Sequence, residues 1–176
     1  MIRSKTKRLV VSGMMLAMGI CLPLLIHSIG IISGNVLLPM HIPVFLCGFL
    51  AGPAAGAVTG FMLPFLNSLI SGMPVMFPNA VIMSGELLTY GAISGLAFKL
   101  TGYKPKHLWI YISLISAMIA GRCVYGLLAA LIFFAFPGGK QLSVITAVVQ
   151  GIPGIIIQLV LIPEIIWVCH KIARRE

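Results

Sequence analysis

Long, uninterrupted apolar runs constrain this chain more than any other feature of its sequence. A transmembrane helix needs about 20 mostly apolar residues, and most of the runs approach or exceed that length. Short turns rich in polar residues, glycine or proline separate them. The expected helices cover residues 9–27, 36–51, 53–70, 79–100, 107–136 and 141–170. The second is the shortest and begins at either Val36 or His41. The sequence therefore predicts an all-α integral membrane protein with six transmembrane helices in a single domain over residues 1–176.

The composition agrees with a chain whose surface faces lipid. Hydrophobic residues make up 60% of the chain and charged residues only 9%, whereas an ordinary soluble domain is about 45–50% apolar and about 25% charged. That difference excludes a soluble globular protein, a disordered chain and a disulfide-stapled secreted domain. The four cysteines lie inside apolar runs without a CxxC pair. We expect them to act as small buried hydrophobic side chains.

The basic residues predict how the helices are oriented. Lysine and arginine number 12 against 3 acidic residues, which gives a formal net charge of +9. They lie at the ends of apolar runs, a pattern that indicates membrane topology and argues against a nucleic-acid partner. With six helices, ten of the twelve fall on one side, Lys140 falls on the other, and Arg122 lies inside a run. Because cytoplasmic loops are enriched in Lys and Arg, both termini are expected in the cytoplasm.

Small residues recur at helical spacing in three of the expected helices. Gly52, Gly56 and Gly60 follow one another every fourth residue in helix 53–70 and just before it, and Gly91 and Gly95 do the same in helix 79–100. Such spacing lets helix backbones approach closely in lipid, and internal packing is the favoured interpretation. In helix 9–27, Gly13 and Ala17 form a similar pair. That pair packs either within the chain or against another subunit.

Polar side chains inside the apolar runs are few, and three of them share one depth. A charged residue at the centre of a membrane helix costs about 2.5–3.5 kcal/mol on insertion scales, so each should have a partner or a polar cavity. At about 1.5 Å per residue, Glu86, Arg122 and Gln150 all fall in the outer half of a hydrocarbon core about 30 Å thick. The polar residues expected to extend the same site are Asn67, Asn79, His41, Tyr90 and Tyr125.

Two compatible interpretations of this polar group stay open. Glu86 and Arg122 form a structural ion pair that locks two helices together, or they line an outward-facing pocket for a small solute. Gln158 lies deeper and is expected to bond across helices. An enzyme is not indicated, because the chain has no aspartate for a Ser/His/Asp set and no HExxH, P-loop or clustered metal ligands. We therefore expect no catalytic residue, no metal and no cofactor.

Several short motifs occur in order along almost the whole chain. They are Leu38–Pro43 with Cys47–Pro53, then Ser71–Pro78 running into Glu86–Gly91, and then the pair Gly121-Arg122. Together with the chain's size, its six expected helices and its cytoplasmic termini, these motifs resemble the substrate-binding S components of energy-coupling factor (ECF) vitamin transporters. The resemblance is to the branch that includes pantothenate and riboflavin binders.

The resemblance implies that the chain captures a water-soluble vitamin outside a bacterial plasma membrane. It would then join a membrane-embedded T subunit and two ABC-type ATPases, which supply the energy. Family members contact the T subunit through small residues on the first helix, typically an AxxxA pattern. Gly13 and Ala17 match that spacing, with glycine in place of the first alanine. The family binds its solute near the outer surface, where Glu86, Arg122 and Gln150 are expected, although pocket residues differ between members.

The solute and even the class of transport protein stay open on sequence grounds. Arg122 favours a carboxylate-bearing solute such as pantothenate, through a bidentate contact, although Glu86 can cancel its charge. Riboflavin, a pyrimidine or pyridine vitamin, lipoate and a corrinoid are alternatives. Two rival classes are a standalone proton-coupled carrier that uses Glu86 and a membrane scaffold without a solute.

Overall fold

The computed structural model describes residues 4–29, 38–102, 106–135 and 144–172, and these residues form helices and turns without a strand. The elements are α1 (Lys5–Ile29), α3 (His41–Ala51), α4 (Pro53–Ser71), the short turn η1 (Met76–Ala80), α5 (Val81–Leu100), α6 (His107–Ala135) and α7 (Val144–Ile172). Five stretches are long and apolar enough to cross a membrane, in α1, α4, η1 with α5, α6 and α7. The prediction of an all-α membrane protein is confirmed for this part of the chain.

Helix α3 is shorter than the sequence led us to expect. It begins at His41 after a turn at Pro39 and Met40, and it has 11 residues. At about 1.5 Å per residue it is about 16 Å long, roughly half of a hydrocarbon core of about 30 Å. Residues 36 and 37 of the expected helix lie outside the described residues. Because α3 alone does not reach across the core, the count of six spans stays a prediction.

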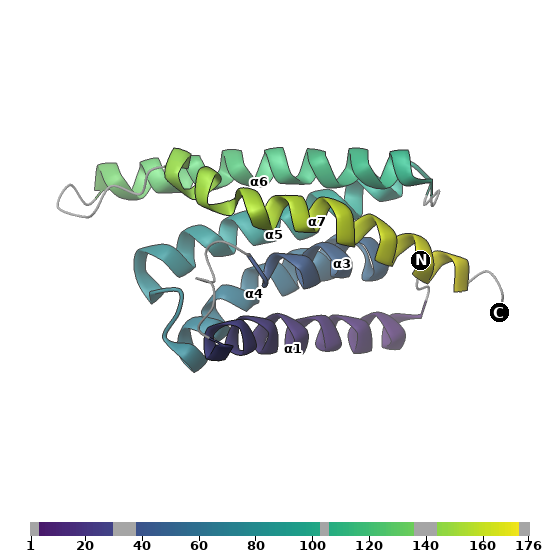
Figure 1. Ribbon diagram of the computed structural model, residues 1–176, viewed down its shortest axis with the longest axis horizontal. Coiled ribbons are helices and arrows are strands. Elements are labelled where there is room, and N and C mark those ends of the chain that lie inside the picture. The colour runs from purple at the N-terminus through teal and green to yellow at the C-terminus, as the bar shows by residue number, and fades with distance from the viewer. Residues whose placement is uncertain (1–3, 30–37, 103–105, 136–143, 173–176) are drawn as a thin grey trace.

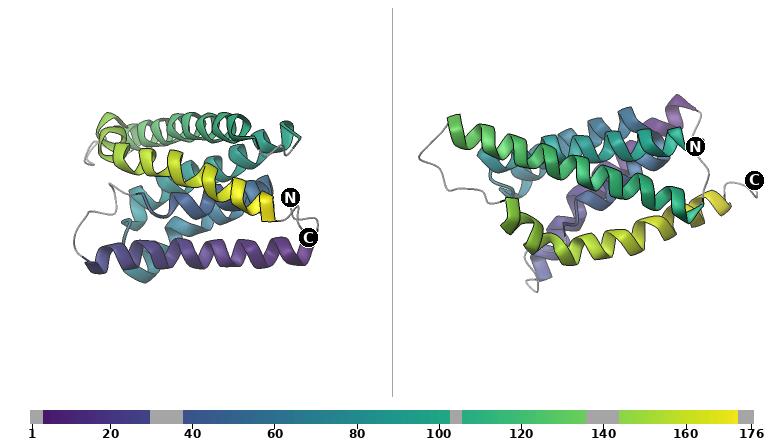
Figure 2. Two further views of the ribbon diagram at one scale, coloured as in Figure 1. Left: turned by 45° about the vertical axis from the view of Figure 1, so that its right-hand side comes forward. Right: turned by 90° about the horizontal axis from the view of Figure 1, so that it is seen from above.

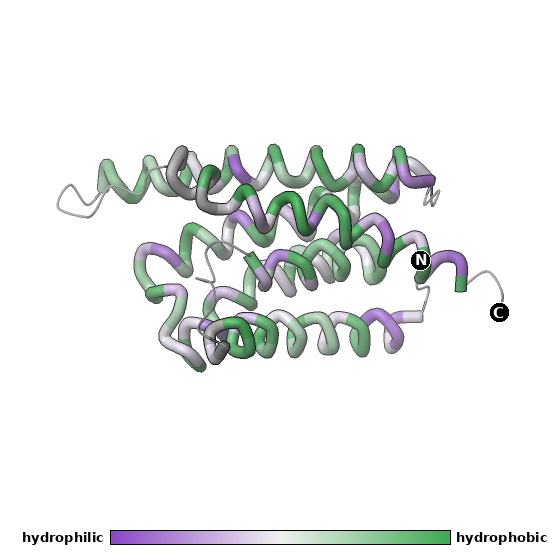
Figure 3. The backbone as a smooth tube through the Cα atoms, viewed as in Figure 1, coloured by the Kyte–Doolittle hydropathy of each residue, from purple (hydrophilic) through white to green (hydrophobic). Residues whose placement is uncertain are grey.

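The helices run side by side, with α1 on one flank of the bundle and α6 on the other (Figures 1 and 2). Helix α5 lies between them and packs against α3, α4 and α6. The start of α1 and the ends of α5 and α7 lie at the same end of the bundle (Figure 1). Figure 3 shows hydrophilic colour at this end of α1 and α7 and mostly apolar colour between the ends. The described basic residues at this end are Lys5, Lys7, Arg8, Lys99, Lys106 and Lys171.

The glycine pattern of α4 and α5 produces direct backbone contact between these two helices. A Cβ atom added at Gly56 would lie 2.6 Å from the carbonyl oxygen of Gly91, and one added at Gly60 would collide with the backbone of Leu87. Gly95 meets Pro53 and Gly48 in the same way. Lipid gives no hydrophobic driving force between helices, so this close approach supplies van der Waals contact instead. The small-residue runs thus serve internal packing, as favoured above.

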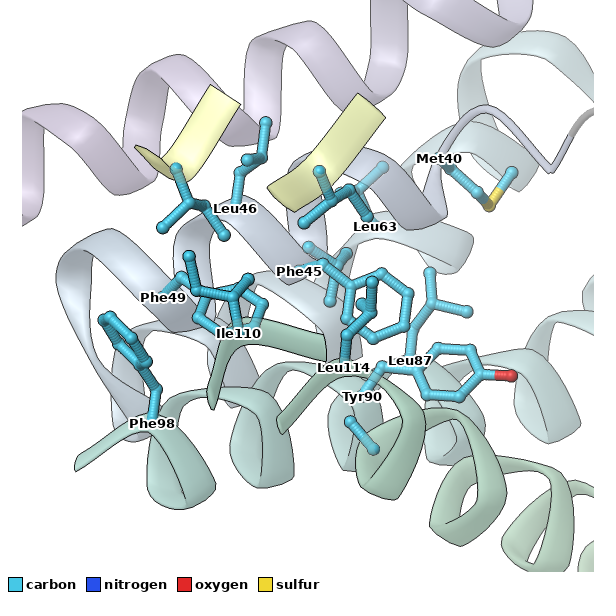
Figure 4. Close-up of a cluster of buried hydrophobic side chains, with 14 residues drawn as sticks. Met40, Phe45, Leu46, Phe49, Leu63, Leu87, Tyr90, Phe98, Ile110 and Leu114 are labelled. Atoms are coloured by element: carbon cyan, nitrogen blue, oxygen red, sulfur yellow. The ribbon is translucent and has the colours of Figure 1, made fainter. Parts of the chain in front are cut away.

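The core lies around α3, most of whose residues are buried. Phe45 and Phe49 are fully buried, and the ring of Phe49 meets that of Phe98 edge-on at 5.2 Å between centroids. Phe45 lies against Tyr90 at 4.8 Å. In Figure 4 the Tyr90 ring closes one edge of this apolar cluster and its hydroxyl points out of it. The core therefore ends at a polar atom, and the candidate site begins there.

Candidate functional site

A buried carboxylate forms the centre of the polar group. Glu86 on α5 is 2% exposed, and its Oε1 atom lies 3.0 Å from Nη1 of Arg122 on α6. The hydroxyl of Tyr90, one turn along α5, donates to the same Oε1 atom at 2.6 Å. Charge-assisted bonds of this kind are shorter and stronger than bonds between neutral groups. The predicted meeting of Glu86 and Arg122 is therefore present, as an ion pair between α5 and α6.

The pair Gly121-Arg122 places both partners of Glu86. A Cβ atom at Gly121 would collide with the ring of Tyr90, so the absence of a side chain there lets this ring pack against α6. The next residue, Arg122, then reaches Glu86 across the same contact. One residue makes room for the tyrosine and its neighbour supplies the positive charge.

Arg122 keeps a hydrogen-bonding capacity that the structure does not use. Its Nη2 atom is buried and has no hydrogen-bond partner among the described residues, while the side chain as a whole is 17% exposed. A Cβ atom at Gly151 on α7 would lie 3.2 Å from Nη2 and 3.0 Å from the Leu38 side chain. The guanidinium therefore lies between Glu86 and α7, with one terminal nitrogen in the ion pair and the other buried without a partner among the described residues.

His41, the first residue of α3, adds a second group of this kind. The side chain is 1% exposed, and its ring lies 5.4 Å from that of Tyr90. Both ring nitrogens lack a hydrogen bond among the described residues, and the carbonyl of Leu38 near the ring accepts the backbone N–H of His41 instead. Leaving a buried polar group unpaired costs about 1–3 kcal/mol. His41 and Arg122 together give the region two unpaired polar groups beside one ion pair.

The other expected site residues occupy different positions. Tyr125 is buried against Ile82 and Ala129, close to the pair. Asn79 is half-buried in η1, just before α5. Asn67 donates to the carbonyl oxygens of Gly19 on α1, at 3.2 Å, and of Leu63, at 3.1 Å, so its amide group joins α4 to α1. Gln150 lies in α7, and its side chain is outside the described residues.

Gly13 and Ala17, the expected docking residues, lie on an open face of α1. Both are exposed, and a Cβ atom at Gly13 would meet nothing within 4 Å. Within the part of the chain that the structure describes, this small-residue pair is not used for internal packing. That finding separates it from the glycines of α4 and α5.

One residue of the region, Gly151, carries a role that the sequence analysis missed, and a second, Gln158, differs from its expected bonding. Gly151 was not singled out, yet its missing side chain leaves the space next to Arg122; the signal was a glycine one residue after Gln150. Gln158 is 1% exposed, and its Nε2 atom has no partner among the described residues. The expected bond from Gln158 across helices is therefore not seen from this atom. The described residues contain no group of three or more side chains suited to a metal ion.

Comparison with known proteins decides the family. The family model for the substrate-specific component of ECF transporters matches residues 7–166. The chain belongs to this family. No curated protein and no solved structure matches the chain.

As an S component, the chain is the substrate-binding subunit of a transporter. It is a multi-pass membrane protein. S components bind a small-molecule substrate and work with T and ATPase subunits. The family membership thus supports the general class expected from the motifs, while the branch within the family stays a prediction.

Proposed function

We propose that this S component captures a carboxylate-bearing vitamin of the pantothenate type at the group formed by Glu86, Tyr90, Arg122 and His41. The observation that carries the proposal is the unpaired Nη2 atom of Arg122. An arginine that served only as a structural partner of Glu86 would gain nothing from a second buried edge without a bond. A solute carboxylate would satisfy that edge once the helices around Arg122 open, because Nη2 itself is buried in this structure.

The hydrogen-bonding groups, and not the net charge, support a carboxylate. Glu86 and Arg122 neutralise each other, so an added anion faces no net positive charge, and its affinity must come from directed bonds. Nη2 offers N–H donors that no described residue uses. A neutral His41 offers one ring N–H and one acceptor nitrogen. Together they match a solute with a carboxylate and a nearby hydroxyl or amide group.

The remaining steps follow the family. The solute would enter from outside, with both termini of the chain in the cytoplasm of a bacterial cell. Two ABC-type ATPases would then supply the energy for uptake through the T subunit, contacted by the face of α1 that carries Gly13 and Ala17. Asn67, Asn79, Tyr125 and Gln150 are proposed as outer lining residues.

Isothermal titration calorimetry of the purified protein with a panel of vitamins tests the solute. We expect a carboxylate-bearing vitamin to bind and Arg122→Ala to weaken it at least tenfold, equivalent to about 1.4 kcal/mol. Glu164→Gln is the matched control, because Glu164 is an exposed acidic residue in the distal half of α7 that lies 3.8 Å from His107. Unchanged affinity in a folded Arg122→Ala protein would contradict the assignment.

The buried carboxylate of Glu86 is also compatible with a second candidate function. A standalone proton-coupled carrier would also place an acidic residue inside the membrane. Uptake that a protonophore abolishes, and that does not need the partner ATPases, would favour that carrier. A protein that binds none of the vitamin panel would instead favour a structural scaffold.

A further inference from the structure

A second region of the protein, far from Arg122, has the shape and charge of a ligand site. A cleft of about 390 Å³ lies where α3 ends and α4 begins, beside the start of α1 and the end of α5. Glu86 and Lys99 are 13 residues apart on α5, so the cleft lies about 20 Å along that helix from the Glu86–Arg122 pair. The two regions are therefore separate.

The floor of the cleft is made of small residues. The turn Ala51–Ala55 lines it and contains only alanine, glycine and proline. Gly52 has a φ of 103°, which side chains rarely adopt, and its N–H caps α3 by donating to Gly48. This glycine lets the chain turn sharply between two helices without a side chain filling the space. The small residues of this turn thus leave room for a ligand in the cleft beside it.

Among the described residues, the charged side chains that line the cleft are basic. Arg8 from α1 and Lys99 from α5 border it, and no acidic side chain among the described residues does. The first turn of α4 lies between them, where the N–H groups of Ala54 and Ala55 have no acceptor within their own helix. Two cationic side chains from two further helices thus face the same small-residue floor. The combination suits an anion with several acceptor oxygens.

The cleft also lies where apolar surface gives way to basic surface. Arg8 is followed by Leu9 and Val10, which are 75% and 56% exposed, and Lys99 is followed by Leu100, which is 80% exposed. Exposed apolar residues of this kind face the hydrocarbon of a bilayer, so the charges beside them lie close to the headgroups. The anion present there at high concentration is the phosphate of a lipid headgroup.

We propose that this cleft binds the headgroup phosphate of an anionic phospholipid, held by Arg8 and Lys99 over the turn Ala51–Ala55. Basic pockets between membrane helices are a known way to hold anionic headgroups. A lipid bound there touches α1, α4 and α5 at once. It would therefore tie the flanking helix α1 to the central pair.

Native mass spectrometry of the full-length protein from detergent micelles, titrated with phosphatidylglycerol, tests the proposal. We expect one phosphatidylglycerol to stay bound and Lys99→Gln to weaken it about fivefold. Arg8→Gln should act in the same direction, and the two changes together should abolish the bound species. Lys7→Gln and Lys171→Gln are matched controls that remove a positive charge at the same end without lining the cleft, and each should change binding less than twofold.

Three results would overturn the proposal. Equal weakening by the control variants would show a general attraction to positive charge and no site. Equal retention of phosphatidylcholine would show that negative headgroup charge is not recognised. Displacement of the lipid by an equal concentration of inorganic phosphate would show a site for a free anion and not for a lipid.

Discussion

At the scale of single residues, the polar group shows how much helical arithmetic predicts. The shared depth of Glu86 and Arg122 follows from counting residues along two helices, because the rise per residue is fixed. Their ion pair was therefore predictable. The direction in which a side chain points around its helix was not, because it depends on which helices become neighbours. Asn67 illustrates this, since its amide nitrogen bonds to the backbone of α1.

The bond from Tyr90 to Glu86 gives a prediction at this scale. Tyr90→Phe keeps the ring against Gly121 but removes the 2.6 Å hydrogen bond. A hydrogen bond to a charged group is worth about 1.5–3 kcal/mol, so the free energy of unfolding should fall by roughly that amount. Thermal or denaturant unfolding in detergent measures it. The control is Tyr111→Phe, because Tyr111 is a half-buried tyrosine on α6. An equal loss of stability in this control would show that the bond from Tyr90 to Glu86 does not stabilise the protein.

At the scale of elements, the ends of the helices were less predictable than their existence. Apolar runs located all the long helices, because lipid requires each spanning backbone to satisfy its own hydrogen bonds. The apolar sequence around His41 did not show whether a spanning helix or a shorter helix would form, because both kinds of helix are apolar. The buried position of α3 explains the ambiguity: a helix enclosed by other helices has the same composition as one that faces lipid.

The contact between α4 and α5 predicts a stability effect. Gly56→Leu would force side-chain atoms into the backbone of Gly91. Overpacking costs about 1–3 kcal/mol when side chains can yield, and a backbone yields less, so the loss should reach the upper end of that range. The unfolding midpoint in detergent measures it. A Gly56→Leu protein as stable as the parent would contradict the close approach of these helices.

The matching substitution on α1 should behave in the opposite way. Gly13→Leu meets nothing within 4 Å of the new Cβ atom, so stability and vitamin binding should stay unchanged. Assembly with the T subunit should fail if α1 docks through its small residues. Co-purification with the T subunit and the ATPases measures this. Survival of the complex would exclude Gly13 from the docking face.

At the scale of the whole molecule, the common position of the basic helix ends predicts the orientation of the protein. Lys7 lies at the basic end, whereas Met73 is 63% exposed in the turn after α4, at the opposite end of that helix from Pro53. After replacement of the native cysteines, Met73→Cys should react with a membrane-impermeant thiol reagent on intact cells. Lys7→Cys should react only after the cells are opened. The reverse labelling pattern would show that the protein has the opposite orientation in the membrane.

The backbone contact between α4 and α5 also restricts how the protein can change shape. Two helices whose peptide groups touch cannot slide or tilt past each other without losing that contact, because packed interiors deform little. They act as one rigid body. Any rearrangement that opens Arg122 to a solute must then come from α6, α7 or the turn before α3, while α4 and α5 stay fixed through four glycines, Gly56, Gly60, Gly91 and Gly95.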